Sequence, residues 1–222
     1  MLQWVFERAR QAKNISDVVV ATDSREIEAA ALDFGANVFR CQRPHTCGSD
    51  RAAEVARTLD AEIVVNVQGD QPFVRANDIE LIVSELRTGS SKLVSAMVPL
   101  EHAEDLNDPD VVKVAVDRHG DALRFSRSPI PVGDDVATSQ PEGVRVRKHL
   151  GLYGFLRTAL LEFASLETRA GEVREGLEQL RAVEAGWRIR MLEVTSTFGS
   201  VDNASDLARA RGHLLSGGAL EE

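Results

Sequence analysis

The chain has 222 residues, 43% of them hydrophobic, which suits one large domain or one domain with a small lobe. Its formal net charge of −9 at pH 7 argues against nucleic acid or an anionic membrane as a partner, because either would need a clustered basic face. The opening stretch MLQWVFERARQAK has no long apolar run, so it predicts neither a signal peptide nor a transmembrane helix. We therefore expect a cytoplasmic protein that binds small molecules.

The first third of the chain alternates helical and strand-like patterns. Apolar residues between Leu2 and Ala9 recur at helical spacing and predict an amphipathic first helix. Ser24 is a typical N-cap for a second helix, which Gly35 can end. The other predicted elements of this part are strands at 17–23, 37–40 and 62–68 and a helix that begins near Ser49. This alternation predicts a mostly parallel sheet with crossover helices.

The second half predicts a different arrangement. The stretch 111–128 reads as two strands around a turn at His119-Gly120, which indicates an antiparallel insertion. After a loop rich in Pro, Gly and Asp, the other predicted elements are strands at 93–100, 148–156 and 189–195 and helices at 157–166, about 172–185 and 202–215. The expected architecture is one α/β domain over 1–222 with a β-rich lobe at about 107–150.

The stretch VVNVQGDQPF places polar residues at the end of an apolar strand. In an open α/β sheet, ligands sit beyond the carboxyl ends of the strands, so Gln68 and Asp70 are candidate ligand contacts. The alternative is an ordinary turn, which Gly and Asp also form. The two cysteines, Cys41 and Cys47, match neither a zinc knuckle nor a redox pair, and the five histidines show no paired helical spacing. Any metal is therefore expected to be a hard cation on oxygen ligands.

Six stretches of the chain together resemble one enzyme family, the 3-deoxy-manno-octulosonate (KDO) cytidylyltransferases. They occur in the family's order and span nearly the whole sequence. They read HTCGSDRAAEVA, VVNVQGDQP, DPDVVKVAVDRHGDALRFSRSPIP, KHLGLYGF, LEQLRAVEAGWRI and VDNASDLARAR. The resemblance implies a Rossmann-like fold of the nucleotide-diphospho-sugar transferase type, in which a mixed, mostly parallel sheet carries a β-rich insertion lobe.

The resemblance also implies a reaction, a metal and a set of site residues. The anomeric hydroxyl of the sugar acid would attack the α-phosphate of CTP, with Mg²⁺ held by Asp70 and Asp202. Taken alone, Asp202 would be read as a turn or helix cap. The family positions that contact the sugar are Gln68, His149, Tyr153, Glu178 and Gln179, with Arg127 as a pocket cation, and those that receive the nucleotide are Thr46, Gly48, Ser49 and Arg51.

Without the resemblance these residues have simpler interpretations. His149 and Tyr153, on one face of a predicted strand, would be polar core residues with internal partners. Glu178 and Gln179 would lie on the solvated face of a helix. Arg127 could equally pair with a surface acid. The family further implies a homodimer formed through the β-rich lobe.

The sequence departs from the family pattern at several points. Members of that family begin with a strand and a basic, Gly-rich loop that cradles the triphosphate, whereas this sequence begins at the following helix, so either its start is misplaced or that half of the site is lost. Cys47, Gln71 and the stretch 131–135 also differ from the usual residues. The alternatives to a KDO cytidylyltransferase are thus a non-catalytic homologue that binds sugar acid or nucleotide without turnover, and a cytidylyltransferase for another acid.

Overall fold

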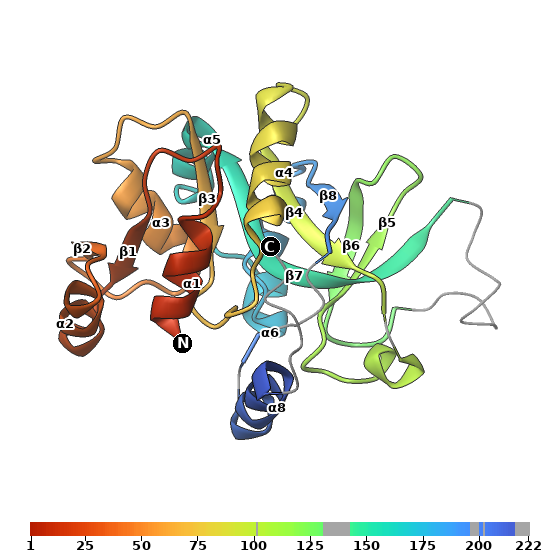
Figure 1. Ribbon diagram of the computed structural model, residues 1–222. Helices are drawn as coiled ribbons and strands as arrows, with labels where there is room; N and C mark the ends of the chain where they lie inside the picture. Colours follow the sequence, from red (N-terminus) through yellow and green to blue (C-terminus); the bar gives the residue numbers. More distant parts are fainter. Residues whose placement is uncertain (101, 131–142, 196–199, 202, 216–222) are drawn as a thin grey trace.

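The structure, a computed structural model, describes all residues except 101, 131–142, 196–199, 202 and 216–222. It has a small parallel sheet of two strands and a mixed sheet of six. The strands are β1 (Val19–Thr22), β2 (Asn37–Arg40), β3 (Ile63–Val67), β4 (Leu93–Val98), β5 (Lys113–Val116), β6 (Ala122–Ser126), β7 (Arg145–Leu156) and β8 (Arg190–Glu193). Figure 1 shows the small sheet at one end of the molecule and β5 and β6 at the other.

The long strand β7 organises the large sheet. It pairs antiparallel with β3, β4 and β5, while β8 lies parallel to β4, so β3, β4, β5 and β8 all point the same way. The predicted α/β class with a mixed sheet is confirmed. The predicted antiparallel insertion is also present, because β5 pairs with β6 around a turn in which Gly120 has a φ of 84°. That positive φ suits glycine.

Helices occupy most of the remaining chain. They are α1 (Leu2–Ala9), α2 (Arg25–Asp33), α3 (Gly48–Ala56), α4 (Ala76–Arg87), the 3₁₀ helix η1 (Ala103–Leu106), α5 (Arg157–Phe163), α6 (Ala170–Glu175), α7 (Gln179–Glu184) and α8 (Ala204–Leu215). Ser24 caps α2 as predicted, because its side chain accepts a hydrogen bond from the Ile27 backbone N–H. Among the described residues, no helix combines the length and apolar character that crossing a bilayer requires.

Two helix predictions need correction. The single helix expected at about 172–185 is two helices, because Gly176 adopts a left-handed conformation with a φ of 64° and ends α6 before α7 begins. Helix α4 had no predicted counterpart, although its buried residues Ile79, Ile82, Val83 and Leu86 recur at helical spacing.

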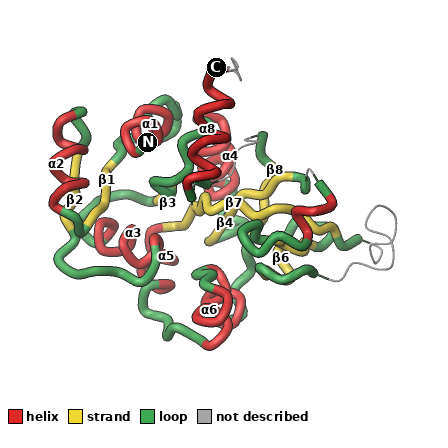
Figure 2. The backbone as a smooth tube through the Cα atoms, turned by 90° about the horizontal axis from the view of Figure 1, so that it is seen from below, coloured by secondary structure: helices red, strands yellow, loops and turns green. Residues whose placement is uncertain are grey.

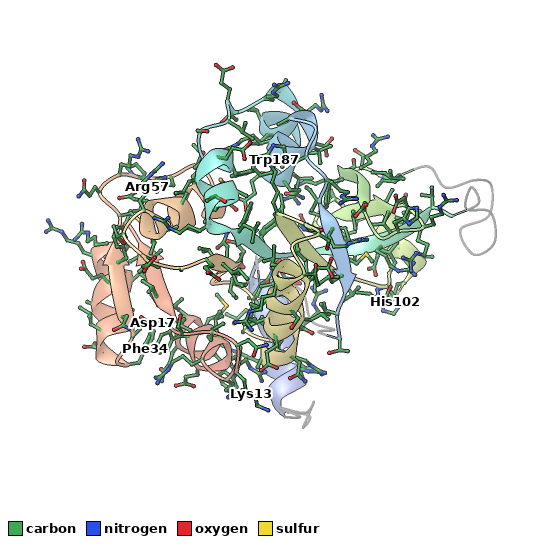
Figure 3. All side chains as sticks on the ribbon, turned by 90° about the horizontal axis from the view of Figure 1, so that it is seen from above. Lys13, Asp17, Phe34, Arg57, His102 and Trp187 are labelled. Atoms are coloured by element: carbon green, nitrogen blue, oxygen red, sulfur yellow. The ribbon has the colours of Figure 1, made fainter. Side chains whose placement is uncertain are left out.

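The helices cover both faces of the large sheet, as the view along the sheet in Figure 2 shows, with α1, α4 and α8 on one side and α3, α5 and α6 on the other. A hydrophobic core lies on each face of the sheet, and successive residues of β4 point into opposite cores. Leu93 packs with α3 and α5, and Val94 packs with α1 and α4. Gly154 of β7 permits the close approach of α4, because a Cβ there would lie 2.2 Å from Cγ2 of Ile82. In Figure 3, His102 lies at the β-rich end, far from Asp17 and Phe34 beside the small sheet.

Candidate functional site

The end of β3, the start of α3 and the middle of β7 meet at Gln68. A Cβ at Gly48 would lie 2.6 Å from Nε2 of Gln68, and a Cβ at Gly151 would lie 3.4 Å from its Cγ. Two glycines from distant parts of the chain therefore make room for this amide. The structure thus brings together two predicted site residues, Gln68 and Gly48, and adds Gly151, which the sequence analysis did not single out.

Asp70 follows Gln68 in a tight turn beyond the strand. The turn is closed by a hydrogen bond from the Gln71 N–H to the Gln68 carbonyl of 3.2 Å, and Asp70 is half-buried. The Val201 N–H donates to the Asp70 carbonyl at 2.8 Å, so the C-terminal segment is tied to this turn. Asp202, the predicted second metal ligand, lies outside the described residues, as do residues 131–135. A carboxylate at this position can supply an oxygen ligand to a hard cation, so the assignment of Asp70 to a metal stays a prediction.

His149 and Tyr153 of β7 form a buried polar group with Ser95 and Gln179. The Tyr153 hydroxyl donates to Oε1 of Gln179 at 2.9 Å, and Nε2 of His149 lies 2.9 Å from the Ser95 hydroxyl. Nδ1 of His149 lies 3.5 Å from Nε2 of Gln179. Burial lowers the pKa of His149 to about 3 and raises the pKa of Tyr153 well above its usual value, so both side chains are neutral. Three predicted sugar contacts therefore form one uncharged hydrogen-bonding surface.

Glu178 connects this region to the start of α3. Its two carboxylate oxygens accept hydrogen bonds from the Ser49 backbone N–H and from the Ser49 hydroxyl, each at 3.0 Å. The Asn66 amide of β3 reaches the same hydroxyl at 3.4 Å. In this structure the Ser49 N–H, one of the donors predicted to face the nucleotide, is bonded to a protein carboxylate. The assignments of Ser49 to the nucleotide and Glu178 to the sugar stay predictions.

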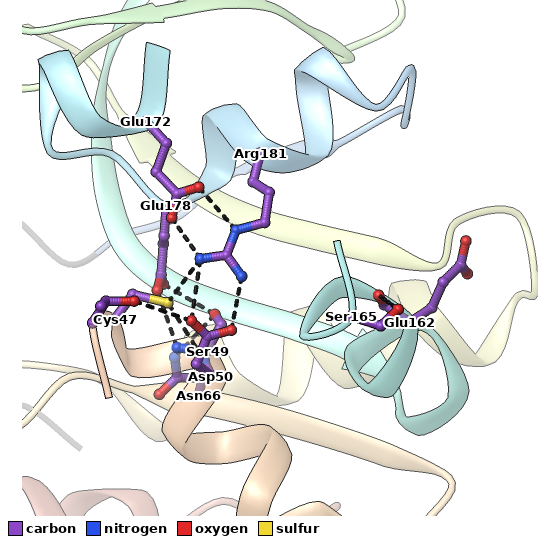
Figure 4. A network of polar contacts seen from close by, with 10 residues as sticks. Cys47, Ser49, Asp50, Asn66, Glu162, Ser165, Glu172, Glu178 and Arg181 are labelled. Atoms are coloured by element: carbon purple, nitrogen blue, oxygen red, sulfur yellow. Dashed lines mark hydrogen bonds and ion pairs between the residues drawn. The ribbon is translucent and has the colours of Figure 1, made fainter. Parts of the chain in front are cut away.

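Behind this contact lies an ion-pair network that the sequence analysis missed. Arg181 of α7 is 2% exposed and binds Glu172 of α6 through two hydrogen bonds of 2.6 and 2.8 Å. It also binds Asp50 of α3 through bonds of 2.8 and 3.1 Å, as Figure 4 shows. Burial opposes ionisation of Asp50, but the hydrogen bonds from Arg181, Cys47 and Thr46 and the charge of Arg181 together outweigh it and lower the pKa of that carboxyl. No spacing rule links these three residues, because they meet only through the packing of three helices.

The remaining predicted residues have contacts of their own. Thr46 donates from its hydroxyl to Asp50 at 3.3 Å, and Arg51 lies 3.7 Å from Asp23 at the end of β1. Arg127 is held by backbone groups, because its guanidinium donates to the carbonyls of Glu175 and Pro109 at 2.9 and 3.1 Å. Its side chain therefore ties the end of β6 to α6.

Comparison with known proteins decides the family. A family model described as cytidylyltransferase matches residues 1–190. The 3-deoxy-manno-octulosonate cytidylyltransferase of Acaryochloris marina is 41% identical over 95% of this chain and 85% of that relative. The chain belongs to this cytidylyltransferase family. The enzyme of the same name from Escherichia coli is 36% identical over 95% of the chain and 84% of its own length.

Solved structures agree with this cytidylyltransferase assignment. A CMP:2-keto-3-deoxy-manno-octonic acid synthetase in complex with CTP matches with a TM-score of 0.87 and 35% identity, over 97% of this chain and 87% of its own. A 4-diphosphocytidyl-2C-methyl-D-erythritol synthase from Anaerococcus prevotii matches with a TM-score of 0.61 over 96% of this chain and 88% of its own, but at 12% identity it shows the fold alone. This cytidylyltransferase is a nucleotidyltransferase with the expected α/β fold.

Proposed function

We propose that this cytidylyltransferase joins CTP and KDO to give CMP-KDO and pyrophosphate. The anomeric hydroxyl oxygen of the sugar acid bonds to the α-phosphorus of CTP, and the bond from that phosphorus to the oxygen bridging to the β-phosphate breaks. Pyrophosphate leaves and the hydroxyl proton passes to water. The observation that carries the proposal is the meeting of β3, α3 and β7 at Gln68, in a chain 41% identical to enzymes of this name.

The sugar acid is assigned to Gln68 and to the neutral group that His149, Tyr153 and Gln179 form. A polyhydroxylated ligand needs donors and acceptors in fixed positions, and these amide, imidazole and phenol groups supply both. Their neutrality supports the choice, because a buried anionic wall would repel the carboxylate of the substrate. The Glu178 carboxylate does not add negative charge to this group, because both of its oxygens accept hydrogen bonds from Ser49.

The nucleotide is assigned to the start of α3, next to Thr46, Gly48, Ser49 and Arg51. Gly48 supports this placement because it has no side chain between the helix start and Gln68. Asp70 would hold Mg²⁺, with Asp202 as the predicted second ligand, since carboxylate oxygens suit this ion. The ion held there would supply positive charge that offsets the negative charge developing on the phosphates during transfer.

We also infer that the enzyme works as a cytoplasmic homodimer. Strand β6 supports the dimer, because it lies at the edge of the sheet as far as the structure describes it and carries Leu123, which is 52% exposed, and an exposed apolar side chain on an edge strand favours association. A net charge of −9 and a nucleotide substrate support the cytoplasm as the compartment. Sedimentation of the full chain tests the dimer, and a monomer at all concentrations would contradict it.

The direct test measures pyrophosphate release from CTP, Mg²⁺ and KDO. We expect release that needs all three components, that UTP and ATP do not support, and that other 2-keto sugar acids support less well. Asp70→Asn should abolish release and leave folding intact, whereas Asp110→Asn, on an exposed loop, should match the parent. Tight binding of CTP or KDO without release would instead identify a non-catalytic homologue, and release with another acid alone would change the acceptor.

A second test addresses the sugar surface. Gln179→Ala should weaken KDO binding by about 1–3 kcal/mol, because it leaves hydrogen-bonding groups of the ligand without partners. Gln11→Ala, at an exposed position after α1, serves as the control and should bind KDO as the parent does. Isothermal titration of the sugar acid gives both values. Equal affinity in Gln179→Ala and the parent would remove α7 from the sugar site.

A further inference from the structure

Three metal-binding side chains converge away from Asp70, in the segment between β2 and α3. Cys41 follows β2, His45 lies in the connecting loop, and Glu54 lies on α3. Within the part of the chain that the structure describes, these are the three whose ligand atoms, one each from thiol, imidazole and carboxylate, all lie within 4.8 Å of one another. Cys41 is buried, with 4% of its surface exposed, while His45 and Glu54 are half-buried and the His45 side chain itself is 5% exposed.

Hydrogen bonds to the backbone hold two of these residues, Cys41 and Glu54, in place. The Cys41 N–H donates to the Thr22 carbonyl at 2.9 Å, which fixes Cys41 to the end of β1. Glu54 accepts a 3.0 Å hydrogen bond from the Gln42 N–H through Oε1, and its Oε2 faces Nε2 of His45. One carboxylate oxygen is therefore anchored while the other points toward the histidine. Such fixed partners for ligand groups are typical of metal sites, where they orient the atoms that bind the ion.

The donor set selects the kind of ion. Sulfur, nitrogen and one carboxylate oxygen together suit Zn²⁺, whereas Mg²⁺ and Ca²⁺ take oxygen ligands. We propose that Cys41, His45 and Glu54 bind one Zn²⁺, with water as the fourth ligand. This site is separate from the predicted Mg²⁺ site at Asp70. Only a hard cation was expected from the sequence, since the spacing of its Cys and His residues matches no zinc motif. Glu54 comes close to Cys41 and His45 only in the folded chain.

Binding of the ion exchanges contacts in a defined way. The direct contact between His45 and Glu54 gives way to one bond from each to the metal, and Cys41 loses its thiol proton to solvent. Burial, followed by the charge of Glu54, raises the pKa of Cys41, with Arg51 opposing and Asp23 adding to the rise. Because zinc replaces the thiol proton, zinc affinity should increase as the pH rises.

The ion also has a route into the site. His45 borders an open hollow of about 220 Å³, so its ring is within reach of solvent ions although it is largely covered. The bound ion would link the loop after β2 to the body of α3. That loop leads directly into Thr46 and Gly48, so zinc would fix the segment that enters the start of α3.

The test titrates Zn²⁺ into the reduced, metal-free full chain in excess Mg²⁺, by calorimetry. We expect one zinc per chain. With Co²⁺ as a spectroscopic probe, we expect a sulfur-to-cobalt charge-transfer band. Cys41→Ser, His45→Ala and Glu54→Gln should each weaken zinc binding by more than the roughly 10–100-fold that losing an outer partner of a metal ligand costs.

Matched variants separate this site from other zinc binding. Cys47→Ser removes the other cysteine and His119→Ala removes an exposed histidine, and both should bind zinc as the parent does. Asp70→Asn should also leave zinc binding unchanged, which keeps this outcome independent of the proposed catalytic metal. The proposal is overturned if the parent takes up no zinc, if Cys41→Ser binds zinc as tightly as the parent, or if Co²⁺ shows no sulfur band. Thermal unfolding without metal confirms that each variant is folded, and Cys41→Ala replaces Cys41→Ser if the latter is not.

Discussion

The network around Arg181 and the group around His149 are both buried and both polar, yet they differ in charge. Arg181 is surrounded by two carboxylates, Glu172 and Asp50, each held by two hydrogen bonds. The group around His149 contains only neutral partners, with burial keeping both His149 and Tyr153 uncharged. A charge can be buried at this depth only when it is matched, whereas neutral groups need hydrogen bonds alone.

This difference assigns the two regions to different tasks. The guanidinium of Arg181 has its donors committed to carboxylates, so it joins α3, α6 and α7 and offers little to a ligand. The neutral group contains weaker hydrogen bonds, such as the 3.5 Å contact between Nε2 of Gln179 and Nδ1 of His149. A ligand could replace such a contact at a small cost in free energy. The charged region therefore acts as a scaffold for the neutral one.

Removing the charge at the centre of the scaffold should have the largest effect. Arg181→Met leaves Glu172 and Asp50 without their cation in a buried site, and breaking such a pair costs about 3–5 kcal/mol. Urea denaturation of the parent and the variant measures the loss. Arg174→Met is the control, because that side chain is 74% exposed and a surface change should stay within about 0.5 kcal/mol. If Arg181→Met is as stable as Arg174→Met, the network has no scaffold role.

The next largest effect should be a loss of stability at acidic pH, caused by the neutral group around His149. The pKa of His149 falls from 6.5 to about 3 on burial, so between these pH values the unfolded chain binds a proton that the folded chain does not. Stability is therefore lost as the pH falls through this window, by about 1.4 kcal/mol per pH unit once well below 6.5. Urea denaturation from pH 7 to pH 4.5 measures this dependence.

His149→Gln isolates the contribution of the imidazole. Other groups such as Asp50, whose pKa is also lowered, remove stability in acid as well, but they are common to parent and variant. The variant should therefore lose stability less steeply with falling pH than the parent. Parallel slopes would show that His149 takes up its proton in the folded state.

Loss of one neutral hydrogen bond should cost less. Tyr153→Phe removes the hydroxyl that donates to Oε1 of the Gln179 side chain at 2.9 Å. An unsatisfied buried acceptor costs about 1–3 kcal/mol of stability. Combining Tyr153→Phe with Gln179→Leu removes both partners of this bond, which should recover part of that loss because the acceptor is gone, while the weak 3.5 Å contact of Nδ1 of His149 is lost. Additive losses in the double variant would show that the two side chains do not interact.

The same contrast explains what the sequence could predict. The β5–β6 hairpin could be predicted because its turn signal is local. Gln68 and Asp70 could be proposed as ligand contacts because they follow a strand end, and that role stays a prediction. The partners of Arg181 were not found, since Asp50 lies on a helix far away in sequence and Glu172 faces Arg181 only because the chain turns between α6 and α7. The break at Gly176 was missed because a single glycine in a helical pattern is often tolerated.

The smallest expected effect lies where the scaffold meets the start of α3. Cys47 is the N-cap of that helix, and its sulfur accepts a 3.5 Å hydrogen bond from the Asp50 N–H. Burial, and after it the charge of Glu178, raises the pKa of Cys47, so the thiol is neutral and a weak hydrogen-bond acceptor.

A hydroxyl oxygen accepts more strongly, and serine is a preferred N-cap, so Cys47→Ser should stabilise the chain by about 0.5–1 kcal/mol. Cys47→Ala removes the cap and should destabilise it instead. Urea denaturation gives the order Ser, Cys, Ala, and a serine variant no more stable than alanine would show that the side chain at position 47 does not cap α3.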